Sequence, residues 1–404
     1  MKCIYSAWIK GISATLALVT ILLAPVSCTS TPPEQEEEAS TVVAESWQVG
    51  EHWQYSQQAI WGDIFIGLEN VFGGGLEAQY ISAYNLRTKE RERFLEIDPH
   101  SVRAGAPSIY ENLVVWSAAD ISEEQQDEFD WNVFLLDLDT GEVRQITDDQ
   151  HVQMEPRIYG NTIVWLDNRH GTGERYPYPQ PLDVYAYDLS TGEEKRITAA
   201  TTVEGYSHPA VSGSFVVWTD SRHADPEVVR HATNEPDYNN EIYMYDLATD
   251  EERRVTDYPG NDRYPTVNGN RIVWLRQSGY READVFVYDL ETGQEAQVSH
   301  SSYATFHPAI YGDHIAWTDA RVSKGNTTND VVEIIVDQNT GKEERREPGA
   351  DIYLHDLKTQ QEVRLTSPLD TGFSLWVCPC IHSEFIVYML DRQIGPITYA
   401  MRLE

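Results

Sequence analysis

Residue types that bind transition metals recur directly before prolines along the chain. The residues in front of Pro107, Pro156, Pro209, Pro265, Pro308 and Pro379 are Ala106, Glu155, His208, Tyr264, His307 and Cys378, and Glu51 takes the corresponding place in the first unit. Carboxylate, imidazole and thiolate groups are ligands for transition metals. Glu155, His208, His307 and Cys378 are therefore a candidate metal set, provided that the fold gathers them at one place. The alternative is that each His-Pro pair only begins a strand, with the imidazole bonded to a loop carbonyl.

A second group of residues lies in long segments of variable length between repeated phrases. These residues are Tyr176, Tyr178, His223, His231 and Tyr238, and many carboxylates accompany them. Aromatic rings beside carboxylates suit sugars, cationic groups or Ca²⁺. We expect a binding face there, since function tends to lie on variable loops held by a rigid scaffold. Solvated acidic loops without a ligand are the alternative. Calcium or a transition metal is the only cofactor that these residues suggest.

Several kinds of chemistry have no signature in the chain. The sequence contains neither G-x-S-x-G nor H-E-x-x-H, the motifs of serine hydrolases and zincins. The run of glycines at 73–75 is not followed by Lys-Ser or Lys-Thr, so it is no phosphate-binding loop. The chain carries 65 acidic against 30 basic residues, a net charge of −35, which argues against a nucleic-acid partner. Catalytic residues cannot be assigned from the sequence.

A repeat of about 50 residues positions these candidates. Its anchors are Trp61, Trp116, Trp165, Trp218, Trp274, Trp317 and Tyr388. Each unit offers four short strands with alternating apolar positions and tight turns. Four antiparallel strands repeated in this way predict an all-β protein, a β-propeller of seven four-stranded blades. Six or eight blades are alternatives, because the first and last units are degenerate. The last unit lacks a fourth strand, which residues 41–49 can supply to close the ring.

Recurrent charged residues are expected to be structural. Aspartates two residues after the tryptophan and arginines four residues after it should brace the loop that leaves the strand. These residues are Asp167, Asp220, Asp319, Arg169, Arg222 and Arg321. Aspartates before Thr-Gly or similar turns should accept turn amides. They are Asp188, Asp246, Asp289 and Asp356.

The repeated phrases resemble those of TolB-type and related WD-like propellers of exported proteins. Two examples carry the resemblance, Asn161-Thr-Ile-Val-Trp-Leu-Asp167 and Asp183-Val-Tyr-Ala-Tyr-Asp-Leu-Ser-Thr-Gly192. The resemblance covers residues 50–403 and implies the fold, but it says little about function. Oligogalacturonate lyases have a similar propeller and a His-rich metal site at the channel mouth. That comparison, by fold only, implies a metal-dependent lyase as a rival function.

The first 40 residues are expected to be a signal peptide followed by a disordered tether. Lys2 and Lys10 precede an apolar run that is short for a membrane span, which predicts a signal peptide over 1–27. The Val26-Ser27-Cys28 end resembles a bacterial lipobox and implies lipidation of Cys28. Ordinary cleavage with release, or a retained anchor, are the alternatives. Residues 28–40 read as a disordered tether and residues 41–404 as the propeller.

Cys378 and Cys380 form either a local disulfide or two buried thiols. Together these features predict an exported, surface-tethered, non-catalytic platform for a protein or glycan. The membrane would be contacted only through a lipid anchor. The alternative is a metal-dependent polysaccharide lyase or hydrolase that uses the channel mouth.

Overall fold

A computed structural model gives the fold of the chain. It describes residues 43–51, 53–54, 59–73, 75–122, 130–170, 182–198, 208–223, 239–279, 282–301, 305–320, 333–336, 343–346, 351–366, 379–392 and 395–404. Residues 41–404 form one compact unit. Within the described ranges there is no helix with the length and hydropathy needed to span a bilayer.

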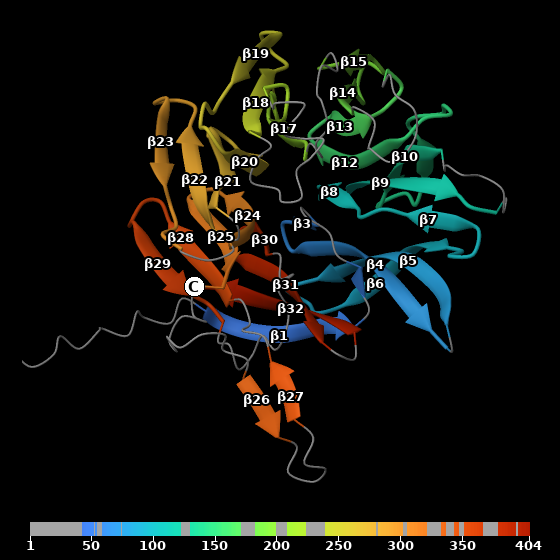
Figure 1. Cartoon of the computed structure of the whole chain (residues 1–404). Helices are drawn as coiled ribbons and strands as arrows, with labels where there is room; N and C mark the ends of the chain where they lie inside the picture. The colour runs from blue at the N-terminus through green and yellow to red at the C-terminus, as the bar shows by residue number, and fades with distance from the viewer. Residues whose placement is uncertain are drawn as a thin grey trace, which may run out of the picture. The chain divides into compact units, whose positions relative to one another are not determined.

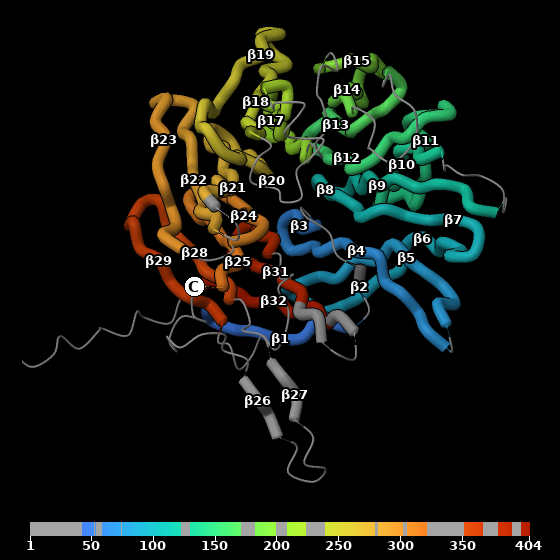
Figure 2. Tube along the Cα trace, viewed as in Figure 1, coloured from blue at the N-terminus to red at the C-terminus, as the bar shows by residue number. Residues whose placement is uncertain are grey.

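Seven antiparallel sheets follow one another around a ring, as predicted (Figures 1 and 2). Blade 1 holds β2 (Trp53–Gln54), β3 (Ile60–Trp61), β4 (Ile64–Phe72), β5 (Leu76–Asn85) and β6 (Arg91–Ile97). Blade 2 holds β7 (Val102–Ala104), β8 (Ser108–Tyr110), β9 (Leu113–Asp120), β10 (Trp131–Asp137) and β11 (Val143–Gln145). Blade 3 holds β12 (Gln153–Tyr159), β13 (Thr162–Asp167), β14 (Asp183–Asp188) and β15 (Glu194–Arg196). Blade 4 holds β16 (Ala210–Ser212), β17 (Phe215–Asp220), β18 (Glu241–Asp246) and β19 (Glu251–Arg254).

The remaining blades follow the same order. Blade 5 holds β20 (Asn261–Asn268), β21 (Arg271–Gly279), β22 (Glu282–Asp289) and β23 (Gln294–Gln297). Blade 6 holds β24 (Thr305–Tyr311), β25 (His314–Asp319), β28 (Asp351–Asp356) and β29 (Gln361–Arg364). Blade 7 holds β30 (Cys380–His382), β31 (Phe385–Arg392), β32 (Gly395–Leu403) and β1 (Val43–Glu51). A separate hairpin, β26 (Glu333–Val336) with β27 (Glu343–Arg346), lies in the connection between β25 and β28.

The N-terminal strand closes the ring, as the sequence predicts. β1 pairs antiparallel with β32 and becomes the outermost strand of the last blade. Val49 of this strand is buried in a cluster that also contains Trp53 of blade 1 and Phe385 of blade 7. The closing strand therefore covers the edge of β32 and adds to the core between the first and last blades.

The core is divided among the interfaces between neighbouring blades. Each blade packs between two neighbouring blades, so its second strand is apolar on both faces. Four tryptophans on these strands are fully buried: Trp165, Trp218, Trp274 and Trp317. Fourth strands such as β15 and β11 lie at the rim and are exposed. The innermost strands β3, β8, β12, β16, β20, β24 and β30 contact one another in sequence around the axis.

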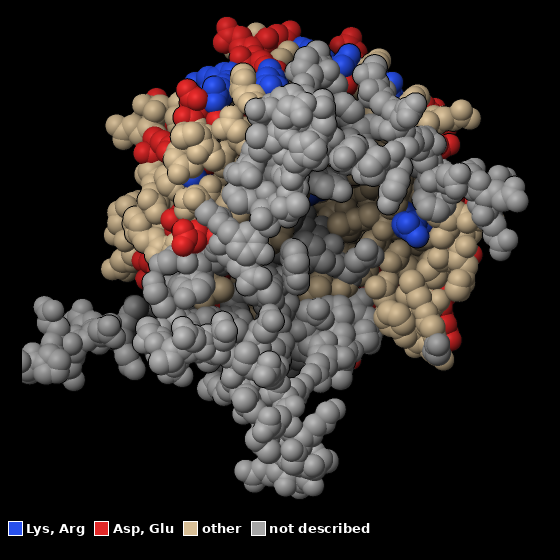
Figure 3. All heavy atoms as spheres, in the orientation of Figure 1, with Lys and Arg blue, Asp and Glu red and all other residues tan. Residues whose placement is uncertain are grey.

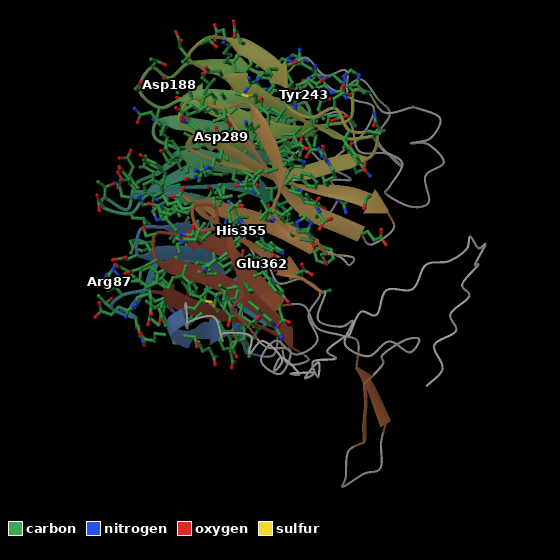
Figure 4. The ribbon with its side chains drawn as sticks, turned by 90° about the vertical axis from the view of Figure 1, so that its left-hand side faces the viewer. Arg87, Asp188, Tyr243, Asp289, His355 and Glu362 are labelled. Carbon is green, nitrogen blue, oxygen red and sulfur yellow. The ribbon has the colours of Figure 1, made fainter. Side chains whose placement is uncertain are left out.

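Two faces of the ring differ in their connections. The hairpins between first and second strands and between third and fourth strands form the hairpin face. The longer connections after second and fourth strands form the loop face. Figure 4 shows Arg87, Asp188 and Asp289, from hairpins of three blades, on one side of the molecule and Tyr243 on the other.

The predicted bracing roles of the repeated aspartates are confirmed where residues are described. Asp188 Oδ1 accepts the N–H of Ser190 at 2.7 Å and that of Thr191 at 3.3 Å. Asp246, Asp289 and Asp356 accept turn amides in the same way. Asp167 accepts the indole N–H of Trp165 at 3.0 Å and the backbone N–H of Arg169 at 2.8 Å.

The same brace recurs around the second-strand carboxylates of blades 4 and 6. Asp220 accepts the indole N–H of Trp218 at 3.0 Å and the backbone N–H of Arg222 at 2.9 Å. Asp319 accepts the indole N–H of Trp317 at 3.3 Å. Arg321 lies outside the described residues.

The predicted position of Trp61 on a second strand is wrong. Trp61 lies on β3, an innermost strand, and not on the second strand of blade 1. The second-strand position belongs to Gly67, where a Cβ would stand 2.5 Å from Cε3 of the fully buried Trp53. Trp53 from β2 thus occupies the space that the repeated tryptophan fills in other blades. Consequently Glu51 lies on the outermost strand β1, paired with Ile397, and not at the channel.

Candidate functional site

Three innermost strands carry an irregularity at the same place. The pairing register of β12, β20 and β24 shifts between Met154 and Arg157, between Arg263 and Thr266, and between Phe306 and Ala309. In each bulge the residue before the proline adopts a left-handed backbone: Glu155 with φ 52°, Tyr264 with φ 56° and His307 with φ 46°. A non-glycine residue held there costs about 1–3 kcal/mol, so the surrounding structure must enforce it. Bulges re-aim side chains and are frequent beside active sites.

These bulges lie where the innermost strands begin, beside the ends of the second strands on the loop face. Gln153 at the start of β12 pairs with Asp167 at the end of β13, and Thr305 of β24 pairs with Asp319 of β25. We call Glu155, His208, Tyr264 and His307 the mouth cluster. Figure 3 shows the molecule hollowed near its centre in the view of Figure 1, with mostly uncharged residues on the visible wall.

The mouth cluster brings together rings from three consecutive blades. The ring of Tyr264 lies 4.4 Å from that of His208 and 5.3 Å from that of His307, measured between centroids. The guanidinium of Arg263 lies 5.2 Å from the Tyr264 centroid. A tyrosine therefore stands between the two predicted histidine ligands, with a cation beside it.

Burial acts against charge on two members of this cluster. The pKa of His307 is lowered to about 4, mainly by burial and to a smaller extent by the neighbouring charges of His208 and Arg263. The imidazole of His307 is therefore neutral at pH 7. Burial also raises the pKa of Glu155, against the opposing effect of Arg157. Within the described part of the chain, Glu155 Oε2 is buried and accepts no hydrogen bond, which is costly for a carboxyl group and favours its neutral form.

The predicted metal set is brought together only in part. His208 and His307 lie on either side of Tyr264, and Glu155 belongs to the same end of the channel. Among the described residues, no group of three or more His, Cys, Asp or Glu side chains can hold a metal ion. Cys378 lies outside those residues, so the four-ligand metal site stays a prediction.

Of the predicted binding face, only His223 is described. Its Nε2 lies 2.7 Å from the hydroxyl of Tyr243, and the two rings are stacked. Arg222 places its guanidinium 4.1 Å from the Tyr243 centroid. In blade 3 His170 stacks on Tyr185 and Arg169 lies over the same ring. His223 is thus part of a repeated brace, which a comparison of Asp167–His170 with Asp220–His223 reveals in the sequence. Tyr176, Tyr178, His231 and Tyr238 lie outside the described residues.

Of the three cysteines with a predicted role, the structure describes Cys380. Cys380 is a buried free thiol on β30, with Sγ 3.5 Å from the carbonyl oxygen of Val387. Burial raises its pKa to about 12, so it is not a reactive thiolate. Cys378 and Cys28 lie outside the described residues, and the disulfide and the lipidation remain predictions.

Two residues beside the mouth were not anticipated. Arg157 follows Glu155 by two positions and opposes the rise in the pKa of that residue. Arg263 directly precedes Tyr264 and lowers the pKa of His307. The chain offers a signal in retrospect, because both arginines flank the X-Pro pairs at 155–156 and 264–265.

Comparison with known proteins bears on the fold alone. No protein-family model and no curated protein matches the sequence. The structure is similar to oligogalacturonate lyase from Vibrio parahaemolyticus, with a TM-score of 0.55 and 14% identity over 90% of this chain and 94% of that chain. It is similar to the propeller domain of the Trilobed protease from Pyrococcus furiosus, with a TM-score of 0.51 and 10% identity over 80% and 84%. TolB from Acinetobacter baumannii matches with a TM-score of 0.44 and 13% identity over 84% and 79%. The chain is a seven-bladed β-propeller, the fold that its resemblance to TolB-type and related propellers implies.

Proposed function

We propose that the protein is an exported, membrane-tethered propeller that binds a glycan or protein partner at the mouth cluster without transforming it. The observation that carries this proposal is the set of left-handed residues at Glu155, Tyr264 and His307. Each stands in a bulge of an innermost strand, and each precedes a proline. Strain retained at the same position in three blades is best explained by what these side chains do there.

A glycan is the ligand class that the mouth cluster favours. A tyrosine ring offers an apolar face, the neutral imidazole of His307 donates and accepts hydrogen bonds, and the buried carboxyl group of Glu155 adds a further polar partner. Such a set matches a sugar ring, which has an apolar face and hydroxyl groups at its edge. Ligand sites commonly combine aromatic walls with a few convergent polar groups. Tyr176, Tyr178, His231 and Tyr238 would extend the contact over the loop face.

Binding of the full chain to a glycan array tests this proposal. We expect Tyr264→Ala and His208→Ala to weaken binding of any captured glycan at least tenfold, which corresponds to about 1.4 kcal/mol. His100→Ala is the matched control, since His100 is exposed in a turn before blade 2. A glycan that binds the variants and the parent chain equally would place the site elsewhere.

A lyase or hydrolase is the second candidate, and Glu155 favours it. A buried carboxyl with a raised pKa and a free oxygen beside a channel is typical of a general acid or base. The similar fold of an oligogalacturonate lyase adds a precedent for cleavage on this scaffold. Release of new reducing ends from an acidic polysaccharide, lost in Glu155→Gln and on chelation of metals, would favour this candidate over simple binding.

The proposed tether depends on Cys28. Metabolic labelling with a fatty acid should mark the full chain and leave Cys28→Ser unlabelled. The variant should then be recovered in the soluble fraction of the envelope. Label retained in Cys28→Ser would contradict the proposed anchor.

A further inference from the structure

The channel ends, on the hairpin face, in a ring of side chains that the mouth cluster does not include. Each innermost strand contributes the last residue before its hairpin. We call these residues the collar: Trp61, Tyr110, Tyr159, Ser212, Asn268, Tyr311 and His382. Three of them link neighbouring blades, since Ser212 accepts the N–H of Gly269, Asn268 that of Gly312 and His382 that of Gly62. These three collar residues thus have a structural role between blades.

Three of its rings form a compact, partly exposed group. Trp61 lies 4.2 Å from Tyr110 and 6.2 Å from Tyr159, and Tyr110 lies 4.8 Å from Tyr159, measured between centroids. None of the three side chains is fully buried. A cation on the exposed side of this group can approach a ring centroid to within about 6 Å, the range in which a cation is attracted to an aromatic face.

A carboxylate adjoins these rings. Glu111 follows Tyr110 directly in the β8–β9 hairpin and is exposed. Burial raises the pKa of Tyr110, and the negative charge of Glu111 raises it further, so the two groups interact.

Glu111 differs from Asp63, Asp313 and Glu384, the carboxylates in other hairpins that follow collar residues, in having no ion pair among the described residues. Arg87 pairs with both Asp63 and Glu384, and Asp313 pairs with Arg271 and Lys358. The negative charge of Glu111 is therefore available to a ligand.

The backbone at Glu111 is of a kind that favours glycine. Its φ is 52°, and five other collar hairpins place glycine at the same position with φ between 55° and 60°. Glutamate is less stable than glycine in this conformation. Blade 2 therefore keeps a carboxylate beside Tyr110 at a cost in stability, as positions that serve binding often do.

We propose that Trp61, Tyr110, Tyr159 and Glu111 form a binding site for an organic ammonium ion on the hairpin face. The rings supply cation–π attraction and Glu111 supplies the counter-charge. This site is independent of the mouth cluster, which lies at the other end of the innermost strands. The same chemistry is found in a free quaternary ammonium compound and in a lysine side chain of a partner protein.

Calorimetric titration of the full chain with choline tests the proposal. The matched ligand control is 3,3-dimethylbutanol, which has nearly the same shape and no charge. We expect choline to bind at least ten times more tightly than the alcohol. Titration with Nα-acetyl-lysine amide distinguishes the two sources, since tighter binding than choline would indicate a lysine of a partner. Equal binding of choline and the alcohol, or no binding of any cation, would overturn the proposal.

Two variants of Glu111 separate binding from folding. Glu111→Gln should weaken choline binding by roughly threefold to tenfold, as expected for the loss of one charged partner. Glu111→Gly should weaken binding equally while raising the melting temperature by about one or two degrees, because glycine relieves the left-handed backbone. Glu291→Gln is the control, an exposed carboxylate in a hairpin of the same face. An unchanged choline affinity in both Glu111 variants would overturn the site.

Discussion

At the scale of single residues, burial decides which groups carry charge in the channel. His307 has a pKa near 4 in the folded chain, against an ordinary value of 6.5. Between these values the unfolded chain holds a proton on this imidazole that the folded chain lacks. The free energy of unfolding therefore rises with pH through this window, and the stability is lost as the pH falls from about 6.5 toward 4.

His307→Asn, a replacement that tolerates the left-handed backbone, should remove this contribution to the pH dependence of stability. Urea unfolding gives the free energy of unfolding at pH 7 and at pH 4.5. The decrease between these two pH values should be about 2 kcal/mol smaller in His307→Asn than in the parent chain. His382, whose pKa burial also lowers to about 4, should account for part of the remaining drop. An equal drop in parent and His307→Asn would show that His307 is solvated in the folded state.

At the scale of elements, the packing of β2 against β4 sets blade 1 apart. Trp53 of β2 is fully buried over Gly67 of β4, and its ring lies 5.1 Å from that of Phe65. Because the indole ring occupies the space above Gly67, Gly67→Ala should destabilise the fold by about 1–3 kcal/mol through overpacking. Gly75→Ala, whose Cβ would meet nothing within 4 Å, should be nearly neutral.

A double variant checks that Trp53 is the cause. Trp53→Phe makes room beside Gly67, so Gly67→Ala should cost less in that background than alone, a coupling that thermal unfolding can measure. Strict additivity of the two changes would mean that the strain of Gly67→Ala arises elsewhere in β4.

At the scale of the whole molecule, closure of the ring depends on the N-terminal strand. Blade 1 holds β1 in place from outside, since Arg91 donates to the carbonyl of Val49 at 3.0 Å and Lys89 forms an ion pair with Glu45. The Lys89 ammonium also lies 4.5 Å from the Trp47 ring. Removing β1 would leave the edge of β32 open and uncover the core between blades 1 and 7.

Truncation before β1 and truncation after β1 should therefore have different effects on stability. A chain of residues 41–404 should elute as a single species with the melting temperature of the full chain. A chain of residues 52–404 should melt at least ten degrees lower and form larger species, because β32 can pair with another copy. Equal melting of the two chains would show that β1 contributes little to closure.

The sequence determined the propeller because its repeat is local and dense. The buried tryptophan on the second strand of blades 2 to 6, the alternating strands and the capped turns each act within a few residues. Asp188, for example, binds amides only two and three positions away. The closing strand was predictable as well, since the last unit lacked a fourth strand. The mouth cluster followed from the same register, because aligned units place X-Pro pairs at one level of the ring.

Only the tertiary structure decided the remaining features. Trp61 was assigned to the wrong strand because its local phrase resembles the repeat, while its true partners come from other blades. The left-handed backbone of Glu155, Tyr264, His307 and Glu111 leaves no clear trace in composition. The contact between Trp61 and Tyr159 joins residues far apart in the chain. Local sequence specifies each blade. The contacts between blades depend on side chains that are far apart in the chain and that meet only when the ring has closed.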